Sequence, residues 1–360
     1  MDLYIHFGIY KAGSSYLQYT LANSRTYLEQ QRIYFPNSKE DSKMYRGFIS
    51  KGNADGLEKA LKNKNVNACL KILRCWKNEA EEKECDKVLI SSEALVHQLA
   101  INERLDILMN ASKKANYRSI HTMGFFRDLV DHALSTYKHR AKSGNIPNFT
   151  NWITNVYETP TLLENLAKCR SKYIDINWTF RKFHKNSNFL KKAFFNDWLK
   201  IEVPVFLGKR TVNESLTISE IFLIQSLRNK YNLVIDYFVE DLKRIPKIEK
   251  GVDKILENHI YSVFRRVLLT RFKGIEQINQ FLSEEEKMDL GNLKNINEIS
   301  EYDKEMILTK KQVEIIVKKI YFFSTLKGRL IFLKRKIRLI FPNWFLKKLL
   351  SFKYVHFSNL

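Results

Sequence analysis

Cysteine, glycine and proline are all scarce in this sequence, and each scarcity excludes a class of protein. The four cysteines form no C-x-x-C pair and have no histidine at ligand spacing, so we expect reduced structural thiols instead of a zinc site or a disulfide framework. With 12 glycines and 6 prolines in 360 residues, the chain has no Gly/Ser/Pro-rich linker, and no fixed-period repeat divides it. A hydrophobic content of 44% is ordinary for a globular enzyme with a sizeable core.

Two further absences concern membranes and secretion. No positively charged leader precedes an apolar stretch at the N-terminus, so we expect no signal peptide and a cytoplasmic protein. No run reaches the roughly 18 apolar residues that a membrane-spanning helix requires.

Acidic residues are missing from the last part of the chain. Residues 315–360 hold eleven lysines and arginines and no Asp or Glu, which is half of the net charge of +22. Leucines and isoleucines between Leu326 and Ile340 recur at helical spacing, and aromatic residues accumulate after Pro342. We therefore predict a main α/β domain over 1–310 and a basic amphipathic tail over 311–360. The tail either binds an anionic membrane surface peripherally or packs on the domain, and we expect no nucleic acid partner because no recognised binding motif accompanies the charge.

A short segment near the N-terminus has the strand–turn–helix pattern of a phosphate-binding turn. An apolar run from Leu3 to Phe7 predicts a buried strand, and the pattern over 14–31 predicts a helix. Between them Gly8 and Gly13 have the G-x-x-x-x-G spacing of a P-loop, but Lys11 lies between the glycines, and Ser14 stands where an NTPase has lysine. Backbone N–H groups and the helix dipole meet at such a turn, so it predicts an anion site.

Two later strands are predicted to end in polar residues that belong to the same site. Val88 to Ile90 leads into Ser-Ser-Glu93, and Ile120 to Phe126 leads into Arg127. In open α/β sheets, ligands bind outside the carboxyl ends of the strands, so we expect these ends to line the site. Further along the chain, the patterns predict a strand over 173–180 and helices over 186–200 and 218–231, which also fit an α/β fold.

The segment His6 to Ser15 closely resembles the 5′-phosphosulfate loop of sulfotransferases that use 3′-phosphoadenosine 5′-phosphosulfate, PAPS. The run from Phe125 to Ser135 is similar to the family's 3′-phosphate motif, in which an arginine ends a strand and a serine follows eight residues later. The resemblance implies a P-loop-like three-layer fold with a central, mostly parallel sheet and a helical C-terminal extension. It also implies a set of nucleotide-binding residues: Gly8, Lys11, Ala12, Gly13, Ser14, Ser15, Arg127, Ser135 and, more loosely, Lys209 and Arg210.

The same resemblance suggests the catalytic groups. Lys11 would neutralise the departing phosphate, and His6 would assist it or else be a packed core histidine. Glu93 is the candidate base, with His97 as runner-up one helical turn later; the alternative for Glu93 is a first-turn acid that stabilises the helix dipole. PAPS chemistry in this family needs no metal, and the acids near Arg127 show no ligand spacing.

These patterns predict an enzyme that moves a sulfuryl group from PAPS to a hydroxyl or amino group of a carbohydrate or glycolipid acceptor. Surface polysaccharide or glycolipid biosynthesis is the implied setting. Two alternatives stay open at this point. One is a P-loop nucleotide kinase that uses ATP and magnesium, and the other is a non-catalytic, membrane-associated module that binds acidic glycans.

Overall fold

The computed structural model describes most of the N-terminal two thirds of the chain and separate segments after it. The described residues are 1–141, 149–184, 187–205, 216–221, 224, 241–242, 262–269, 275–288 and 310–324. The chain divides into two compact units. The first unit comprises Met1–Tyr137, Pro147–Thr211 and Asn258–Glu298, and the second comprises Lys138–Ile146, Val212–Glu257 and Ile299–Leu360. The division into 1–310 and 311–360 stays a prediction.

The first unit is built on a five-stranded sheet in the order β2-β3-β1-β4-β5, and all of its strand pairs are parallel. The predicted α/β class is thereby confirmed. The strands are β1 (Asp2–Gly8), β2 (Ile33–Tyr34), β3 (Lys87–Ser91), β4 (Ser119–Phe126) and β5 (Ile176–Lys182). Strand β1 is central, and its residues are all buried, as expected for a parallel strand covered on both faces.

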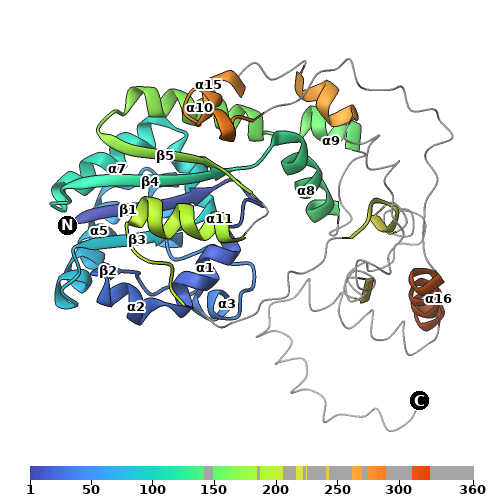
Figure 1. Ribbon diagram of the computed structural model, residues 1–360, viewed down its shortest axis with the longest axis horizontal. Helices are drawn as coiled ribbons and strands as arrows, with labels where there is room; N and C mark the ends of the chain where they lie inside the picture. The colour runs from blue at the N-terminus through green and yellow to red at the C-terminus, as the bar shows by residue number, and fades with distance from the viewer. Residues whose placement is uncertain are drawn as a thin grey trace, which may run out of the picture. The chain divides into compact units, whose positions relative to one another are not determined.

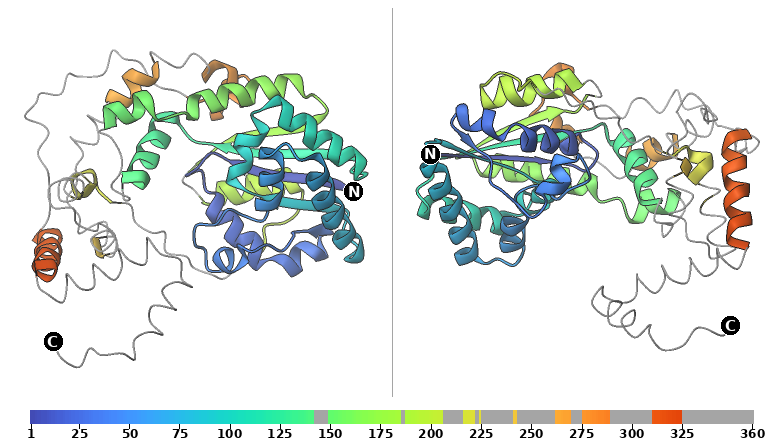
Figure 2. Two further views of the ribbon diagram at one scale, coloured as in Figure 1. Left: turned by 180° about the vertical axis from the view of Figure 1, so that it is seen from behind. Right: turned by 90° about the horizontal axis from the view of Figure 1, so that it is seen from below.

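Helices cover both faces of this sheet (Figures 1 and 2). One face carries α1 (Ser14–Asn23), α2 (Arg25–Gln30), α11 (Ser187–Lys191) and the π-helical segment η2 (Lys192–Leu199). The other face carries α4 (Asp55–Lys62), α5 (Val66–Glu82), α7 (Asn102–Lys114) and α10 (Thr159–Lys172). The remaining helical elements described for this unit are α3 (Asp41–Tyr45), η1 (Glu93–Leu95), α6 (Val96–Leu99), α8 (Leu129–Ala141, of which the part from Lys138 belongs to the second unit), α9 (Phe149–Asn155), helical residues 262–269, α15 (Ile275–Asn279) and η4 (Glu284–Glu286).

Side-chain alternation along β1 explains why both faces are covered. The ring of Tyr4 packs edge-on against Trp198 of η2, with centroids 5.2 Å apart. Phe7 points to the opposite face and packs against Phe180 at 6.3 Å. Phe180 in turn contacts Phe281, which follows α15, at 6.0 Å. Aromatic side chains therefore fill both layers beside the central strand and fix the position of its carboxyl end.

Among the described residues of the first unit, the predicted strands and helices are present and differ from the predictions at their ends. The helix predicted over 14–31 is broken at Ser24, where φ is −117° and the chain restarts as α2. Asn23 donates from Nδ2 to the Tyr19 carbonyl at 2.8 Å, and this side-chain bond near the end of α1 competes with continuation of the helix. The strand predicted from Tyr173 begins only at Ile176.

The second unit is described in short segments only. Thr217 and Glu220 form a reciprocal capping box at the start of the helix predicted from Ile218, with bonds of 3.1 and 2.7 Å. The buried Gln312 of α16 (Lys310–Ser324) donates to Glu220 at 2.7 Å. The rest of the predicted tail, residues 325–360, lies outside the described residues. In the described part of the chain, no helix is both long and apolar enough to cross a bilayer.

Candidate functional site at the carboxyl edge of the sheet

The turn between β1 and α1 carries the phosphate-loop motif. Lys11 has φ of 67° and Gly13 has φ of 87°, so both lie in the left-handed region. A Cβ at Gly13 would also lie 2.8 Å from side-chain atoms of Leu190 and Phe183. Glycine is therefore required at this position by both backbone conformation and space. Ala12, between the two, is fully buried.

The first turn of α1 provides donors that suit an anion. Gly13 is the N-cap, no side chain caps the helix, and the first turn holds no acid. A Cβ on Gly8 would lie 2.9 Å from Ser14 Oγ, so the missing side chain leaves room for that hydroxyl. Ser14 Oγ is buried beside the carboxyl group of Glu93, while Ser15 is half-buried. An uncapped helix N-terminus beside a buried hydroxyl is an arrangement that suits an anion.

Glu93 follows the carboxyl end of β3 and faces this turn. Ser92 hydrogen-bonds through its N–H to the His6 carbonyl at 3.0 Å, which fixes the end of β3 against β1. Burial raises the pKa of Glu93 to about 7, although the neighbouring Ser14 hydroxyl and the charge of Lys11 oppose the rise. The structure thus brings Glu93, Ser14 and Lys11 together. A carboxyl group with a pKa near neutrality has the proton affinity that a general base needs.

Arg127 follows β4 and reaches back to the same turn. It donates through Nη1 to the Lys11 carbonyl at 3.5 Å, and its Nη2 lies 3.5 Å from the Asp131 carboxylate. Its Nε is buried and has no partner among the described residues, and its guanidinium lies 6.0 Å from the centre of the Phe183 ring. Ser135 is half-buried two turns into α8, on the helix face that starts at Arg127.

The order of the strands explains why these groups meet. After β1 the chain crosses to β2 at one edge of the sheet, and after β4 it crosses to β5 at the other edge. Neighbouring strands whose connections leave in opposite directions form a topological switch point, where ligands bind in open α/β sheets. Lys11 and Arg127 lie in the two connections that diverge there.

The two predicted histidines have different surroundings. His6 is 0% exposed, its Nδ1 lies 2.8 Å from Ser91 Oγ, and burial lowers its pKa to about 3. The ring packs edge-on against Phe194 of η2, with centroids 5.2 Å apart. These contacts are those of a core histidine, and a catalytic role for it stays a prediction. His97 on α6 is exposed, and its ring lies 6.0 Å from that of Tyr10 in the loop.

Sequence reasoning missed a segment that supports the end of β3. Gly52 has φ of 79°, and a Cβ there would lie 1.8 Å from the Ser91 carbonyl oxygen. Asn53 accepts from the Ser91 N–H at 2.7 Å, and Ser50 donates to Gln18 of α1 at 2.7 Å. Only the glycine gave a signal in the sequence, because these contacts join residues that are 32 to 39 positions apart.

Arg181, near the end of β5, makes its ion pairs outside this group. Arg181 pairs with Glu286 at 2.7 Å and with Asp197 at 3.2 Å, so its guanidinium is held by carboxylates. Lys209 and Arg210 lie outside the described residues. Within the described ranges, no group of three or more His, Cys, Asp or Glu side chains is placed to hold a metal ion.

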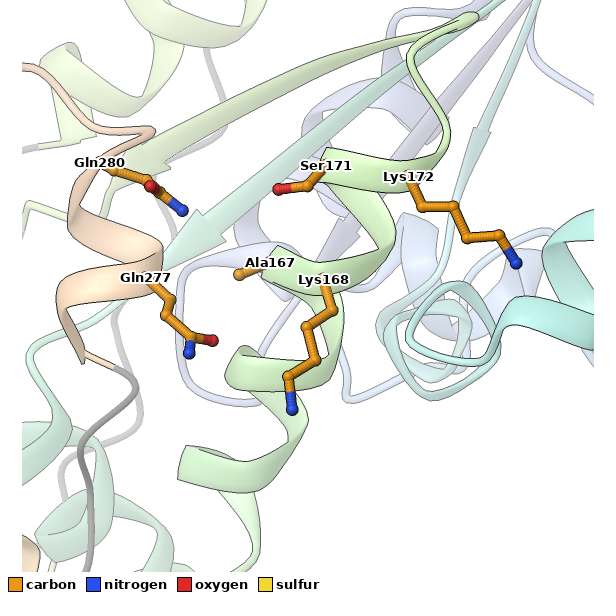
Figure 3. A pocket seen from close by; sticks show the side chains of 6 residues that line it. All are labelled: Ala167, Lys168, Ser171, Lys172, Gln277 and Gln280. Carbon is orange, nitrogen blue, oxygen red and sulfur yellow. The ribbon is translucent and has the colours of Figure 1, made fainter.

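A separate hollow of about 490 Å³ lies between α10 and α15 (Figure 3). It is lined by Ala167, Lys168, Ser171, Lys172, Gln277 and Gln280. The lining residues of α10 lie at its C-terminal end, shortly before β5 begins, so the hollow lies towards the amino ends of the strands. It includes none of the predicted site residues.

Comparisons of the chain with protein-family models, with curated proteins and with solved structures found no match.

Proposed function

We propose that the chain is a PAPS-dependent sulfotransferase with a P-loop-like fold. The observation that carries the proposal is the meeting of Lys11, Ser14 and Glu93 at the ends of β1 and β3, with Arg127 bonded to the same loop from the end of β4. The strand order and the glycine turn between β1 and α1 support the P-loop-like architecture. The buried Ser14 Oγ, and Arg127 Nε, which has no partner among the described residues, are donors that fit a bisphosphorylated nucleotide.

The residues divide into a donor side and an acceptor side. Lys11, Ser14, Ser15 and the loop amides would hold the 5′-phosphosulfate, and Arg127 with Ser135 would hold the 3′-phosphate. A guanidinium gives a permanently charged, planar fork for phosphate oxygens, and a hydroxyl adds a neutral donor. The phosphate on the 3′-oxygen is what distinguishes this nucleotide from ATP.

Glu93 would take the proton of the acceptor. The acceptor oxygen then forms a bond to sulfur, the bond from sulfur to the bridging phosphate oxygen breaks, and Lys11 stabilises the charge that develops on the departing bisphosphate. The pKa of about 7 leaves Glu93 largely ionised above neutrality, yet basic enough to accept the proton. A carbohydrate or glycolipid acceptor, and attachment to an anionic membrane by the tail, belong to this proposal as well.

Calorimetric titration tests the proposal against its kinase alternative. We expect adenosine 3′,5′-bisphosphate to bind without magnesium and Arg127→Ala to weaken that binding at least about tenfold, since charged hydrogen bonds contribute roughly 1.5 to 3 kcal/mol. Arg181→Ala is the matched control, because Arg181 lies one residue before the end of β5 but its guanidinium pairs with two carboxylates. Magnesium-dependent binding of ATP alone would instead establish the kinase alternative. No nucleotide binding, with no effect of Lys11→Ala, would favour the non-catalytic module.

A further inference from the structure

The loop that follows α3 exposes large apolar side chains. Phe48 is 56% exposed and Ile49 is 62% exposed, and Tyr45, at the end of α3, is exposed as well. Among the described residues of the first unit, most side chains of this kind are buried in the core. Neighbouring exposed apolar residues, unlike single ones, mark a surface that contacts another molecule or a membrane. The proposed reaction uses none of these residues.

Backbone hydrogen bonds hold Phe48 in its exposed position. Gly47 has a left-handed φ of 66°, and its N–H donates to the Met44 carbonyl at 2.8 Å. The N–H of Phe48 donates to the Lys43 carbonyl, also at 2.8 Å. These two bonds form a Schellman motif, in which the residue in the place of Phe48 commonly packs on the last turns of the helix. The helix offers the exposed polar residues Ser42 and Lys43 at these positions, so it does not cover the Phe48 ring.

The other end of the loop is fixed to the carboxyl edge of the sheet. Ser50 is buried and donates to Gln18 of α1 at 2.7 Å. Asn53 then accepts from the N–H of Ser91, the last residue of β3, at 2.7 Å. Helix α3 packs on α1 near the carboxyl ends of the strands (Figure 1). The exposed apolar side chains therefore lie towards the edge of the sheet that holds Glu93, two residues after Ser91.

Basic side chains flank the apolar ones. Over residues 38–52 all lysines and arginines are exposed, namely Lys39, Lys43, Arg46 and Lys51. The two acids of this segment, Glu40 and Asp41, are half-buried. Glu40 lies 2.9 Å from the ammonium group of Lys43, and Asp41 faces inward to the guanidinium of Arg25 at the same distance. The segment therefore presents apolar groups with positive charge on both sides, which complements an anionic surface.

The size and composition of this patch favour a bilayer over a protein partner. A stable protein interface takes roughly 20 to 30 residues from each side and has few lysines in its core. Residues 45–51, the 45–51 loop, instead combine three large apolar side chains with two bases, as segments that enter the headgroup region of a membrane do. We propose that the 45–51 loop inserts Tyr45, Phe48 and Ile49 into an anionic bilayer and turns the carboxyl edge of the sheet towards it.

The 45–51 loop determines which side of the first unit faces the lipid. One weak anchor gives only marginal attachment, and stable binding takes two. The loop is the second anchor beside the proposed tail, and it adds orientation to affinity. For the proposed function, on which only this consequence rests, an acceptor hydroxyl of a membrane glycolipid would reach Glu93 at the bilayer surface.

Flotation of the full chain with liposomes of phosphatidylcholine and phosphatidylglycerol measures the contribution of the loop. The double variant Phe48→Ser with Ile49→Ser should bind at least about tenfold more weakly, because two large side chains no longer leave water. Arg46→Gln should bind about fivefold more weakly, as expected for one charge near an anionic surface. Ile174→Ser is the matched control and should bind like wild type, because Ile174 is 82% exposed just before β5, at the amino ends of the strands.

A fluorescent label tests the orientation. An environment-sensitive dye on Ile49→Cys, with the exposed Cys75 replaced by serine, should shift to the blue when these liposomes are added, because the dye enters the bilayer. The same dye on Ile174→Cys should not shift. Native thiols at the other cysteines are buried and do not take the label.

Three results would overturn the proposal: no shift at Ile49, equal shifts at Ile49 and Ile174, or flotation of the double variant equal to that of wild type. A shift at Ile49 that grows with protein concentration in the absence of lipid would overturn it too, because a second copy of the chain would then cover this surface. Neither measurement involves a nucleotide, whereas titration with adenosine 3′,5′-bisphosphate tests the proposed function alone. Failure of one proposal is therefore distinguishable from failure of the other.

Discussion

Replacing Glu93 by glutamine should stabilise the protein in a way that depends on pH. The ordinary pKa of 4.5 applies to the unfolded chain, and the pKa in the folded protein is about 7. Between these values the folded state binds more protons, so the free energy of unfolding of the wild type falls as pH rises from about 4.5 to 7. Glutamine does not titrate, so the free energy of unfolding of the variant does not fall in this way.

The size of the effect follows from the two pKa values. Their difference of about 2.5, at 1.36 kcal/mol per unit, corresponds to about 3 kcal/mol. Glu93 is partly exposed, and solvent screens part of its charge, so we expect about 2 kcal/mol of this to be measurable. The glutamine variant should gain this amount relative to wild type between pH 5 and pH 8.

Urea unfolding followed by tryptophan fluorescence at pH 5 and pH 8 measures the difference. Glu82→Gln is the matched control for the substitution, because Glu82 is exposed at the end of α5. A gain below about 0.5 kcal/mol for Glu93→Gln would refute the burial argument. Transfer activity adds a second readout, because a base with this pKa gives a rate that rises about tenfold per pH unit below 7 and levels off above it. The glutamine variant should lose transfer while it gains stability.

Three further perturbations test other parts of the structure. Gly52→Ala should destabilise the protein by about 3 kcal/mol or more, since its Cβ would meet the Ser91 carbonyl at 1.8 Å and its φ is 79°, whereas Gly56→Ala, whose Cβ would have ordinary contacts, should change the melting temperature little. Ser135→Ala should weaken binding of adenosine 3′,5′-bisphosphate about tenfold and leave adenosine 5′-phosphosulfate, which has no 3′-phosphate, unaffected; equal losses for both would remove Ser135 from the 3′-phosphate site. Truncation after Ser324 should abolish flotation with anionic liposomes, and unchanged flotation would contradict the proposed membrane attachment of the tail.

Local sequence patterns predicted the strands and turns that form the site, but they did not predict the contacts that support its residues. The ends of β1, β3 and β4 could be predicted because apolar runs stop there at Gly8, Ser91 and Arg127. The break at Ser24 was missed because the apolar stripe continues through it.

The supports of the site come from contacts between distant parts of the chain. The contact of Gln18 with Ser50 spans 32 positions, and that of Ser91 with Asn53 spans 38. The periodicity of apolar residues along the sequence does not predict contacts between such distant residues. Glu93 was predicted as a candidate base from its place after a strand, but its raised pKa depends on burial that only the fold supplies.

The bond from Arg127 to the Lys11 carbonyl joins the two halves of the site through one peptide. A group that orders the guanidinium also restrains the loop, and a group that orders the loop restrains the guanidinium, so their binding free energies are reciprocally linked. For the nucleotide proposed above, each phosphate would improve the affinity for the other beyond the sum of separate contacts. The binding free energies of two mononucleotides, each with one of the two phosphates, would then add up to less than the binding free energy of the nucleotide that has both.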